Sequence, residues 1–580
     1  MCRIAGIFDP SSKTLLQDIT SMRDVMHRGG PDDAGLYIDD TFPLAFGHRR
    51  LSLIDLSSSG HQPMQDLDGQ LQLIYNGEIY NFKELKAELT VKGFKFKTQS
   101  DTEVILKAYQ AWGTNCLARF SGMYALAIFD KMHSIIILGR DHAGIKPLYY
   151  SLVNDKLIFG SEIRAFKALN PRWEANENWP NIFLAFGHLP EPLTTLKNVH
   201  PLAKGSFGVF DMHTKKMVIK KHYVYDFFEC IKSIVEAKQI IREKLTKAVQ
   251  RHLFSDAPIG LFLSGGIDSS LLTILSQPIL KERLHTLSIV FEEQEFSEKK
   301  YQDIIIKKTG ARHQSFSVSK KEFEHSLEDI LQAMDQPSTD GVNSYFISKY
   351  AHEAGLKAVL SGLGGDELFG GYKSFTTFNK FKYLKTFAPL LAPIAGLAGD
   401  KYKKLGYLNL RGAVGYYLAV RGILNLDEIS RITGDSVTKI KEQLNDLNLF
   451  YPCELTDTWA LASWTELNMY MQNQLLKDSD YMSMWHGLEI RVPFLDKDLI
   501  NAVTSISTDV KKNKQGKFLL IESFKAELPI EIWNRRRQGF TFPFAKWVEN
   551  DQLVNKGIAN GVHWSKNWTI NILERFNGEN

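Results

Sequence analysis

The pattern of apolar and polar positions divides the chain into two parts of different architecture. Up to about residue 210, short apolar and alternating runs separated by turn residues predict strands, for example at 71–81, 124–130 and 156–163. Helical patterns at 82–89 and 102–112 lie between such runs. We therefore expect stacked antiparallel sheets with helices in the first part.

A different repeat begins at residue 259, where each short apolar run is followed by a helical pattern. The runs at 259–263, 284–291 and 356–362 predict strands of a parallel sheet that helices cover on both faces. Apolar residues at helical spacing between Ile234 and Val249 precede this part. Beyond about residue 373 helical patterns dominate.

Length, charge and cysteine content narrow the class of protein. A chain of 580 residues is too long for one core, so we expect domains at 1–210 and 234–580 joined by a linker at 211–233. The net charge of +4 comes from dispersed basic residues and indicates no nucleic-acid partner. The apolar run 387–399 is shorter than the roughly 20 residues of a membrane span. Four cysteines without metal-type spacing indicate a reduced, cytoplasmic protein.

The strongest chemical signal is the stretch LFLSGGIDSS at 261–270, between a predicted strand and a predicted helix. Two glycines let the backbone turn with its N–H groups inward, towards the positive end of the helix. Serine hydroxyls add donors, and Asp268 can hold Mg²⁺ against phosphate oxygens. No lysine follows, so this is not the loop that grips β- and γ-phosphates in P-loop proteins. We expect an anion cradle.

The second signal is Cys2, directly behind the initiator methionine in MCRIAGIFDP. Removal of Met1 would leave a thiol and an α-amine on one residue. The amine, with a pKa of about 8, could then take the thiol proton, so that nucleophile and base share one residue. By itself, a cysteine in this position is more often an inert small residue.

The loop SGGIDSS resembles the pyrophosphate-binding loop of ATP pyrophosphatases. The stretches SGLGGDELFGGY (361–372) and GLEIRVPFLD (487–496) resemble synthetase motifs of the glutamine-dependent asparagine synthetase family, and the resemblance extends over nearly the whole chain. It implies an α/β protein. An αββα N-terminal-nucleophile glutaminase domain would precede an α/β parallel-sheet ATP pyrophosphatase domain with a helical C-terminal part.

The resemblance also implies the residues of a synthetase site that uses ATP and Mg²⁺. Asp268 and Asp366 would hold the metal, and Arg537 would replace a lysine that usually contacts pyrophosphate, with changed geometry. Ile289, Ser361 and Gly362 would flank the adenosine. The pyrophosphate would lie against Ser264, Gly265, Gly266, Asp268 and Ser269.

For the first domain, the resemblance makes Cys2 the nucleophile of a class II glutaminase. Arg50 would pair with the carboxylate of glutamine, and Asp101 would bind its α-amine. The stretch YNGEIYN would supply the oxyanion hole from Asn76 and the Gly77 N–H, with Glu78 beside them at the glutamine site. Without this context, the Asn-Gly pair is a hairpin-turn signal.

Three positions depart from the family pattern. Arg3 follows the nucleophile where glycine is usual, and it would either crowd the site or favour the thiolate. The loop usually written RGPDD carries an additional glycine, Gly30. Leu363 stands where an acidic residue usually deprotonates ammonia or contacts the acceptor. Either another group such as Glu489 takes that role, or the acceptor is not aspartate.

These signals predict a two-site amidotransferase with glutamine, ATP and a carboxylate as substrates. Ammonia released by the glutaminase would pass through an internal channel to an adenylated carboxylate. Asparagine synthesis from aspartate is the leading assignment, and amidation of a sugar uronic acid or a peptide carboxylate is the nearest alternative. We leave a homodimer open.

Other classes are less consistent with the motifs. An amide-forming cyclase needs no ammonia, whereas this chain keeps a full glutamine pocket. A simple N-terminal-nucleophile amide hydrolase would use only the first domain. An idle scaffold or regulatory protein would not be expected to keep Cys2, Arg50, Asp101 and Asp268 together.

Overall fold

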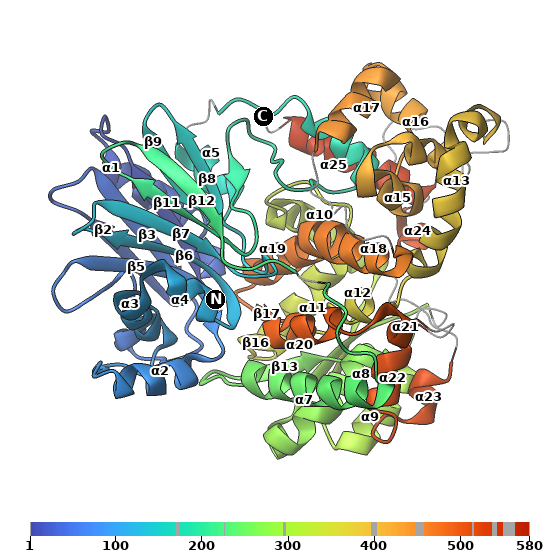
Figure 1. Cartoon of the computed structure of the whole chain (residues 1–580), viewed down its shortest axis with the longest axis horizontal. Helices are drawn as coiled ribbons and strands as arrows, with labels where there is room; N and C mark the ends of the chain where they lie inside the picture. Colours follow the sequence, from blue (N-terminus) through green and yellow to red (C-terminus); the bar gives the residue numbers. More distant parts are fainter. Residues whose placement is uncertain are drawn as a thin grey trace.

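The computed structural model describes most of the chain as two domains (Figure 1). The described residues are 2–169, 173–225, 227–293, 297–395, 403–447, 457–512, 516–535, 542–548 and 563–578.

The N-terminal domain is built on two stacked six-stranded sheets with antiparallel pairing. Their strand orders are β10-β8-β9-β1-β3-β2 and β12-β11-β7-β6-β5-β4. The first contains β1 (Arg3–Phe8), β2 (Asp33–Ile38), β3 (Leu44–Arg50), β8 (Tyr149–Val153), β9 (Lys156–Gly160) and β10 (His200–Pro201). The second contains β4 (Met64–Gln65), β5 (Leu71–Ile79), β6 (Gly122–Asp130), β7 (Ile135–Arg140), β11 (Ser206–Asp211) and β12 (Lys216–Lys221).

Helices cover the outer faces of both sheets. On one side, α1 (Leu15–Asp24) and α5 (Ile163–Leu169) pack on the first sheet, and on the other α2 (Phe82–Val91) and α3 (Asp101–Trp112) pack on the second. Fully buried side chains such as Ile4 fill the space between the sheets. Burial on both faces explains why central strands such as β6 are apolar throughout. The expected αββα arrangement is confirmed.

The boundary between the domains lies further along the chain than the sequence pattern indicates. The expected linker 211–233 contains β12, which pairs with β11 along its whole length, from Ser206↔Lys221 to Asp211↔Lys216. This strand looks like linker in the sequence because it is an edge strand with mostly exposed side chains. The connection is therefore confined to residues after 221, before α7 (Ile234–His252).

The second domain contains the expected parallel sheet, with strand order β15-β14-β13-β16-β17. All four pairings are parallel. Its strands are β13 (Ile259–Phe262), β14 (His285–Phe291), β15 (Arg312–Val318), β16 (Ala358–Leu360) and β17 (Glu489–Arg491). Strands β14 and β15 are added to one side of β13, and strands β16 and β17 are then added to its other side. The order thus reverses between β13 and β16.

Helices cover this sheet, and further helices form the C-terminal part (Figure 1). Those packed around the sheet include α7, α8 (Ile267–Leu280), α9 (Lys299–Thr309), α10 (Lys320–Ala333), α11 (Val342–Glu353) and α19 (Leu476–Trp485). The remaining ones include α6 (Trp179–Phe186), α12 (Gly365–Phe369), α13 (Ser374–Ala395), α15 (Gly412–Arg421), α16 (Leu426–Thr433), α17 (Val437–Asp446), α18 (Thr458–Thr465), the π-helix η7 (Glu466–Leu475), α20 (Lys497–Thr504), α22 (Phe518–Ser523), α24 (Phe544–Val548) and α25 (Trp564–Gly578). Among the described helices, none is both long enough and apolar enough to cross a membrane.

Candidate active sites

A cavity of about 590 Å³ opens at the carboxyl ends of β13 and β16. The strand order reverses between these two strands, and ligands of open α/β sheets bind at such a point. The loop after β13 carries SGGIDS, and the loop after β16 carries SGLGGDE. Both motifs singled out in the sequence therefore face one cavity.

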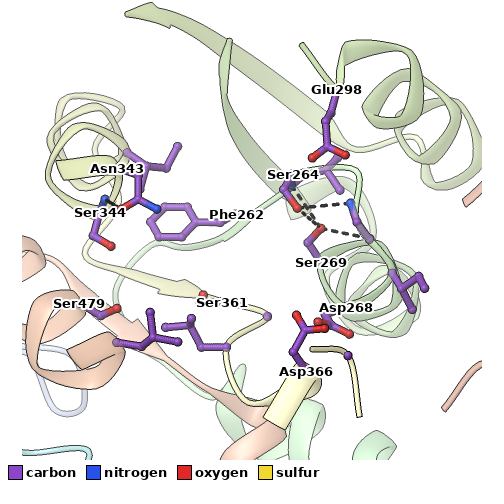
Figure 2. A pocket seen from close by; sticks show the side chains of 18 of the residues that line it. Phe262, Ser264, Asp268, Ser269, Glu298, Asn343, Ser344, Ser361, Asp366 and Ser479 are labelled. Carbon is purple, nitrogen blue, oxygen red and sulfur yellow. Dashed lines mark hydrogen bonds between the residues drawn. The ribbon is translucent and has the colours of Figure 1, made fainter. Parts of the chain in front are cut away.

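The loop after β13 has the geometry of an anion cradle. Gly265 has a φ of 83°, and Gly266 caps the N-terminus of α8 in an extended conformation. The hydroxyls of Ser264 and Ser269 lie 3.0 Å apart, and the Ser269 hydroxyl accepts the Ser264 N–H at 3.2 Å (Figure 2). Backbone donors, two hydroxyls and a helix N-terminus thus meet at one point, as phosphate oxygens require.

Two carboxylates converge beside the cradle. Figure 2 shows Asp268 and Asp366 pointing towards each other, and the Lys517 ammonium lies 2.5 Å from one and 2.6 Å from the other. A Cβ at Gly365 would lie 2.5 Å from the Asp268 carboxyl carbon, so only glycine allows this approach. Paired carboxylates next to a phosphate cradle suit Mg²⁺, which usually takes one or two carboxylates and completes its shell with phosphates and water. Within the described ranges, no group of three or more such side chains forms a closed metal site.

Lys517 was missed in the sequence. It precedes α22, far along the chain from both aspartates, and its only local signal is the short GKFLL run. Burial lowers the pKa of its ammonium, but the two carboxylates outweigh burial and raise that pKa. The residue therefore stays charged and brings a cation to the place where phosphate oxygens would lie.

The other residues expected at the ATP site lie around the same cavity, with one exception. Ile289, Ser361, Gly362 and Leu363 line it. Arg537 lies outside the described residues.

Arg535, from the same basic run as Arg537, lines the cavity. It donates to the Gly265 carbonyl at 3.1 Å and to Glu298 at 2.8 Å. The basic run at 535–537 thus contacts the cradle through Arg535, a residue that the sequence pattern does not predict at this site.

Acidic side chains are present in this cavity although Leu363 is apolar. Asp340 and Asp478 line it, and Asp478 accepts the Ser338 hydroxyl at 2.7 Å. Burial raises the pKa of both carboxyls, and Asp340 raises that of Asp478 further. Buried carboxyls with raised pKa values are typical of sites that exchange protons with a substrate. Their positions, 340 and 478, gave no motif in the sequence.

In the first domain, Cys2 lies at the start of β1 and is buried. Its N–H donates to the Asn76 Oδ1 at 3.1 Å. Among the described residues, Asn76 Nδ2 has no acceptor although it is buried. An unused donor next to the thiol is what an oxyanion hole offers. Burial raises the pKa of the Cys2 thiol, so a base is needed to form the thiolate.

The Asn76-Gly77 pair is not a hairpin turn. It lies inside β5 and pairs with Ala125 and Tyr124 of β6. Gly77 has a φ of 152°, and a Cβ there would lie 2.0 Å from the Met123 carbonyl oxygen. Only glycine fits, and the strand therefore holds the pair rigidly beside Cys2.

Arg50 and Asp101, expected to bind glutamine, are both buried near this strand. Asp101 accepts the Tyr75 hydroxyl at 2.9 Å and the Ile79 N–H at 3.0 Å. Arg50 donates to loop carbonyls, including that of Ser57 at 2.8 Å. Both side chains are therefore held in place by the protein itself before any ligand contributes contacts.

Glu78 connects this site to the second domain. It lies 3.2 Å from the guanidinium of Arg491, which also binds Glu489. Burial raises the pKa of Glu78 well above its usual range. For Glu489, burial also raises the pKa, but Arg491, the N-terminal amine and Lys146 together outweigh burial and lower it. Two carboxyl groups thus share Arg491. Glu489 lies at this interface, whereas the adjacent Ile490 lines the ATP-side cavity.

Arg3 does not point at the thiol of Cys2 but into the interface. Its guanidinium binds Glu162 and lies 2.9 Å from Asp480, which is also 3.3 Å from Lys146. A Cβ at Gly29 would lie 2.8 Å from Cγ of Arg3. The glycine-rich loop that is one residue longer than the family pattern therefore packs against the unusual Arg3.

Comparison with known proteins agrees with this arrangement. A model of the glutamine amidotransferase domain matches residues 1–224, and a model of the asparagine synthase family matches residues 240–561. The chain is 31% identical to asparagine synthetase [glutamine-hydrolyzing] 1 of Bacillus subtilis (strain 168) over 99% of this chain and 93% of that one. It is 29% identical to asparagine synthetase [glutamine-hydrolyzing] 3 of the same organism, over 93% and 87%. Amidase chry2 of Gibberella zeae is 24% identical, also over 93% and 87%.

Proposed function

Because the chain belongs to the asparagine synthase family and carries a glutamine amidotransferase domain, we propose that it makes an amide from a carboxylate, ATP and glutamine. The products would be the amide, AMP, pyrophosphate and glutamate. The observation that supports the proposal most strongly is that strand β17 contacts both sites. Its Arg491 binds Glu78 of the Cys2 site, while its Ile490 lines the cavity with the phosphate cradle.

In the glutaminase half-reaction, removal of Met1 turns the Cys2 nitrogen into an α-amine that takes the thiol proton. The thiolate attacks the side-chain amide carbon of glutamine, and Asn76 Nδ2 with the Gly77 N–H stabilises the developing oxyanion. Ammonia leaves, and water releases glutamate from the thioester. Arg50 and Asp101 hold the carboxylate and the α-amine of glutamine.

In the synthetase half-reaction, a carboxylate oxygen attacks the α-phosphorus of ATP, and pyrophosphate leaves. The cradle and Lys517 hold the phosphates, and Mg²⁺ held by Asp268 and Asp366 would neutralise their charge. Ammonia then attacks the acyl carbon, AMP leaves, and a base takes the additional proton. Passage through an internal channel would keep ammonia unprotonated. A reduced cytoplasm is the expected setting.

The first acceptor that we propose is aspartate, which would give asparagine. Leu363 cannot bind its ammonium group, but Asp340 and Asp478 line the same cavity and can replace the missing acidic residue. Glu489 is less suited to this role because it pairs with Arg491 at the interface.

The test is a reaction with MgATP and aspartate, with glutamine or ammonia as nitrogen source, followed by AMP measurement and mass spectrometry. Asparagine and AMP in equal amounts support the proposal. The proposal would be overturned if neither aspartate nor any other carboxylate tested led to AMP formation. It would also be overturned if the product formed with glutamine contained no nitrogen from glutamine. Asp478→Asn should weaken aspartate use strongly, and Lys525→Ala, an exposed site, serves as the control.

A further inference from the structure

A second cavity of about 550 Å³ adjoins the cavity that holds the phosphate cradle. The two share four wall residues, Asp340, Asn343, Tyr372 and Lys373. A molecule whose reacting group lies in the first cavity can therefore extend into the second. Aspartate is too small to need this space.

The walls of the second cavity are rich in aromatic rings. They come from α6, α15, η7, α24 and α25, in the helical part of the molecule (Figure 1). The rings belong to Phe186, Tyr372, Tyr417, Tyr470, Phe542, Phe544, Trp564 and Trp568. Aromatic faces pack well on ring-shaped ligands that have an apolar face.

Polar groups lie between these rings. Arg421 pairs with Glu466 at 2.8 Å and lies 3.7 Å from the centre of the Tyr470 ring. Gln474 donates to the Thr339 hydroxyl at 3.3 Å. These groups offer donors and acceptors for hydroxyls.

The indole N–H of Trp568 adds a further donor. It is buried in the cavity wall and has no acceptor among the described residues. Buried donors are normally satisfied, so an unused one in a cavity wall points to a ligand.

Aromatic rings alternating with hydrogen-bonding groups match a pyranose ring, whose faces are apolar and whose edge carries hydroxyls. Among the described residues, helices and loops line this cavity, so an extended peptide would find no strand edge to pair with.

We propose that the second cavity is an acceptor subsite for a hexuronic acid residue, so that the enzyme also converts uronates to uronamides. The inference rests on the proposed function, because it uses the same adenylation. The uronate oxygen attacks the α-phosphorus, pyrophosphate leaves, ammonia displaces AMP, and one proton passes to a base. The carboxylate lies at the shared wall, and the ring lies among the aromatic side chains.

The test compares aspartate with the methyl glycosides of glucuronic and galacturonic acid. Glutamine-dependent AMP formation and a uronamide in the mass spectrum are expected with at least one glycoside. If aspartate or a peptide carboxylate is amidated and neither glycoside is, the subsite is wrong while the proposed function stands. If no carboxylate yields AMP and an amide, the proposed function itself fails.

Variants that fill the second cavity test whether the sugar ring of the glycoside binds there. Val420 lines only this cavity, and Val420→Trp should raise KM for the glycoside at least tenfold while KM for aspartate changes less than twofold. Ser565→Trp, on a different wall, should act in the same way. Ile432→Trp, at an exposed position on α16, should change neither. Equal effects on both acceptors, or no effect on the glycoside, would overturn the assignment.

Discussion

The two sites of this protein are built in opposite ways. Around Cys2, the functional side chains lie inside or next to strands. They already form hydrogen bonds with other protein atoms. Arg50 and Asp101 are held by backbone and tyrosine groups. On the ATP side, Asp268 and Asp366 lie in the first turns of helices, and Lys517, directly before another helix, pairs with both carboxylates. The first site is therefore held mainly by nearby backbone and side-chain groups of one domain, whereas the second is held by ion pairs between three separate segments.

The largest effect is expected from Cys2→Ala, which tests whether the two sites are chemically separate. Without the thiol, glutamine-dependent synthesis should fall by about 10³-fold or more, because Cys2, next to Asn76, is the proposed nucleophile. Synthesis from ammonia should stay within twofold. Cys116→Ala, at a buried cysteine elsewhere in the domain, is the control. Equal loss with both nitrogen donors would show that the sites are not separate.

Asp268→Asn tests the ATP-side site. The change removes one of two converging charges, so AMP formation should fall by about 100-fold, while glutamine hydrolysis without acceptor persists. A matched Asp509→Asn variant, at an exposed position of the helix Thr508–Lys511, should behave like the wild type. Normal AMP formation by Asp268→Asn would exclude this loop from the ATP site.

Arg3→Ala tests the link between the sites. Its removal leaves Glu162 and Asp480 without their shared buried cation, which loosens the interface next to Cys2. We expect glutamate release per amide formed to rise about three- to tenfold, as ammonia escapes. Ammonia-dependent synthesis should change little, and Arg3→Lys should restore part of the coupling. An unchanged ratio would mean that Arg3 only fills space against Gly29.

The smallest effect concerns Glu367, in the wall of the ATP-side cavity. Burial, and then the neighbouring Asp366, raises its pKa to about 8, and the Tyr372 hydroxyl donates to it at 2.8 Å. Between its unfolded pKa of about 4.3 and this value, the folded state holds a proton that the unfolded state has lost, so stability falls as pH rises through this window.

Glu367→Gln removes that proton equilibrium. Thermal unfolding followed from pH 5 to 9 should therefore show a smaller fall in apparent Tm for the variant, by a few degrees. Glu353→Gln at the end of α11 is the control, with a profile like that of the wild type. Parallel profiles of Glu367→Gln and wild type would contradict the raised pKa.

Much of the fold could be predicted because its patterns are local. Alternation along short strands indicated the stacked sheets, and strand-helix repeats indicated the parallel sheet. The boundary was misplaced because β12 is an edge strand, and its polar residues resemble those of a linker. Pairing with β11, which no local pattern encodes, makes it part of the N-terminal domain.

The sequence by itself predicted the two chemistries. Glycines next to serines and Asp268 predict a phosphate cradle where a strand leads into a helix, and the motifs that accompany Cys2 predict an N-terminal nucleophile through their resemblance to class II glutaminases. The function of such motifs depends on backbone geometry within a few residues. They can therefore be recognised in the sequence before the fold is known.

Only the tertiary structure decided how the chemistries meet. Lys517 reaches two aspartates from other segments, Asp340 and Asp478 converge from separate helical regions, and Arg3 turns away from the thiol into the interface. Ion pairs and cavity walls join residues hundreds of positions apart, and their distances depend on the packing of whole elements. No local pattern records that packing, because the same side chains would serve equally well as solvated surface charges in another fold.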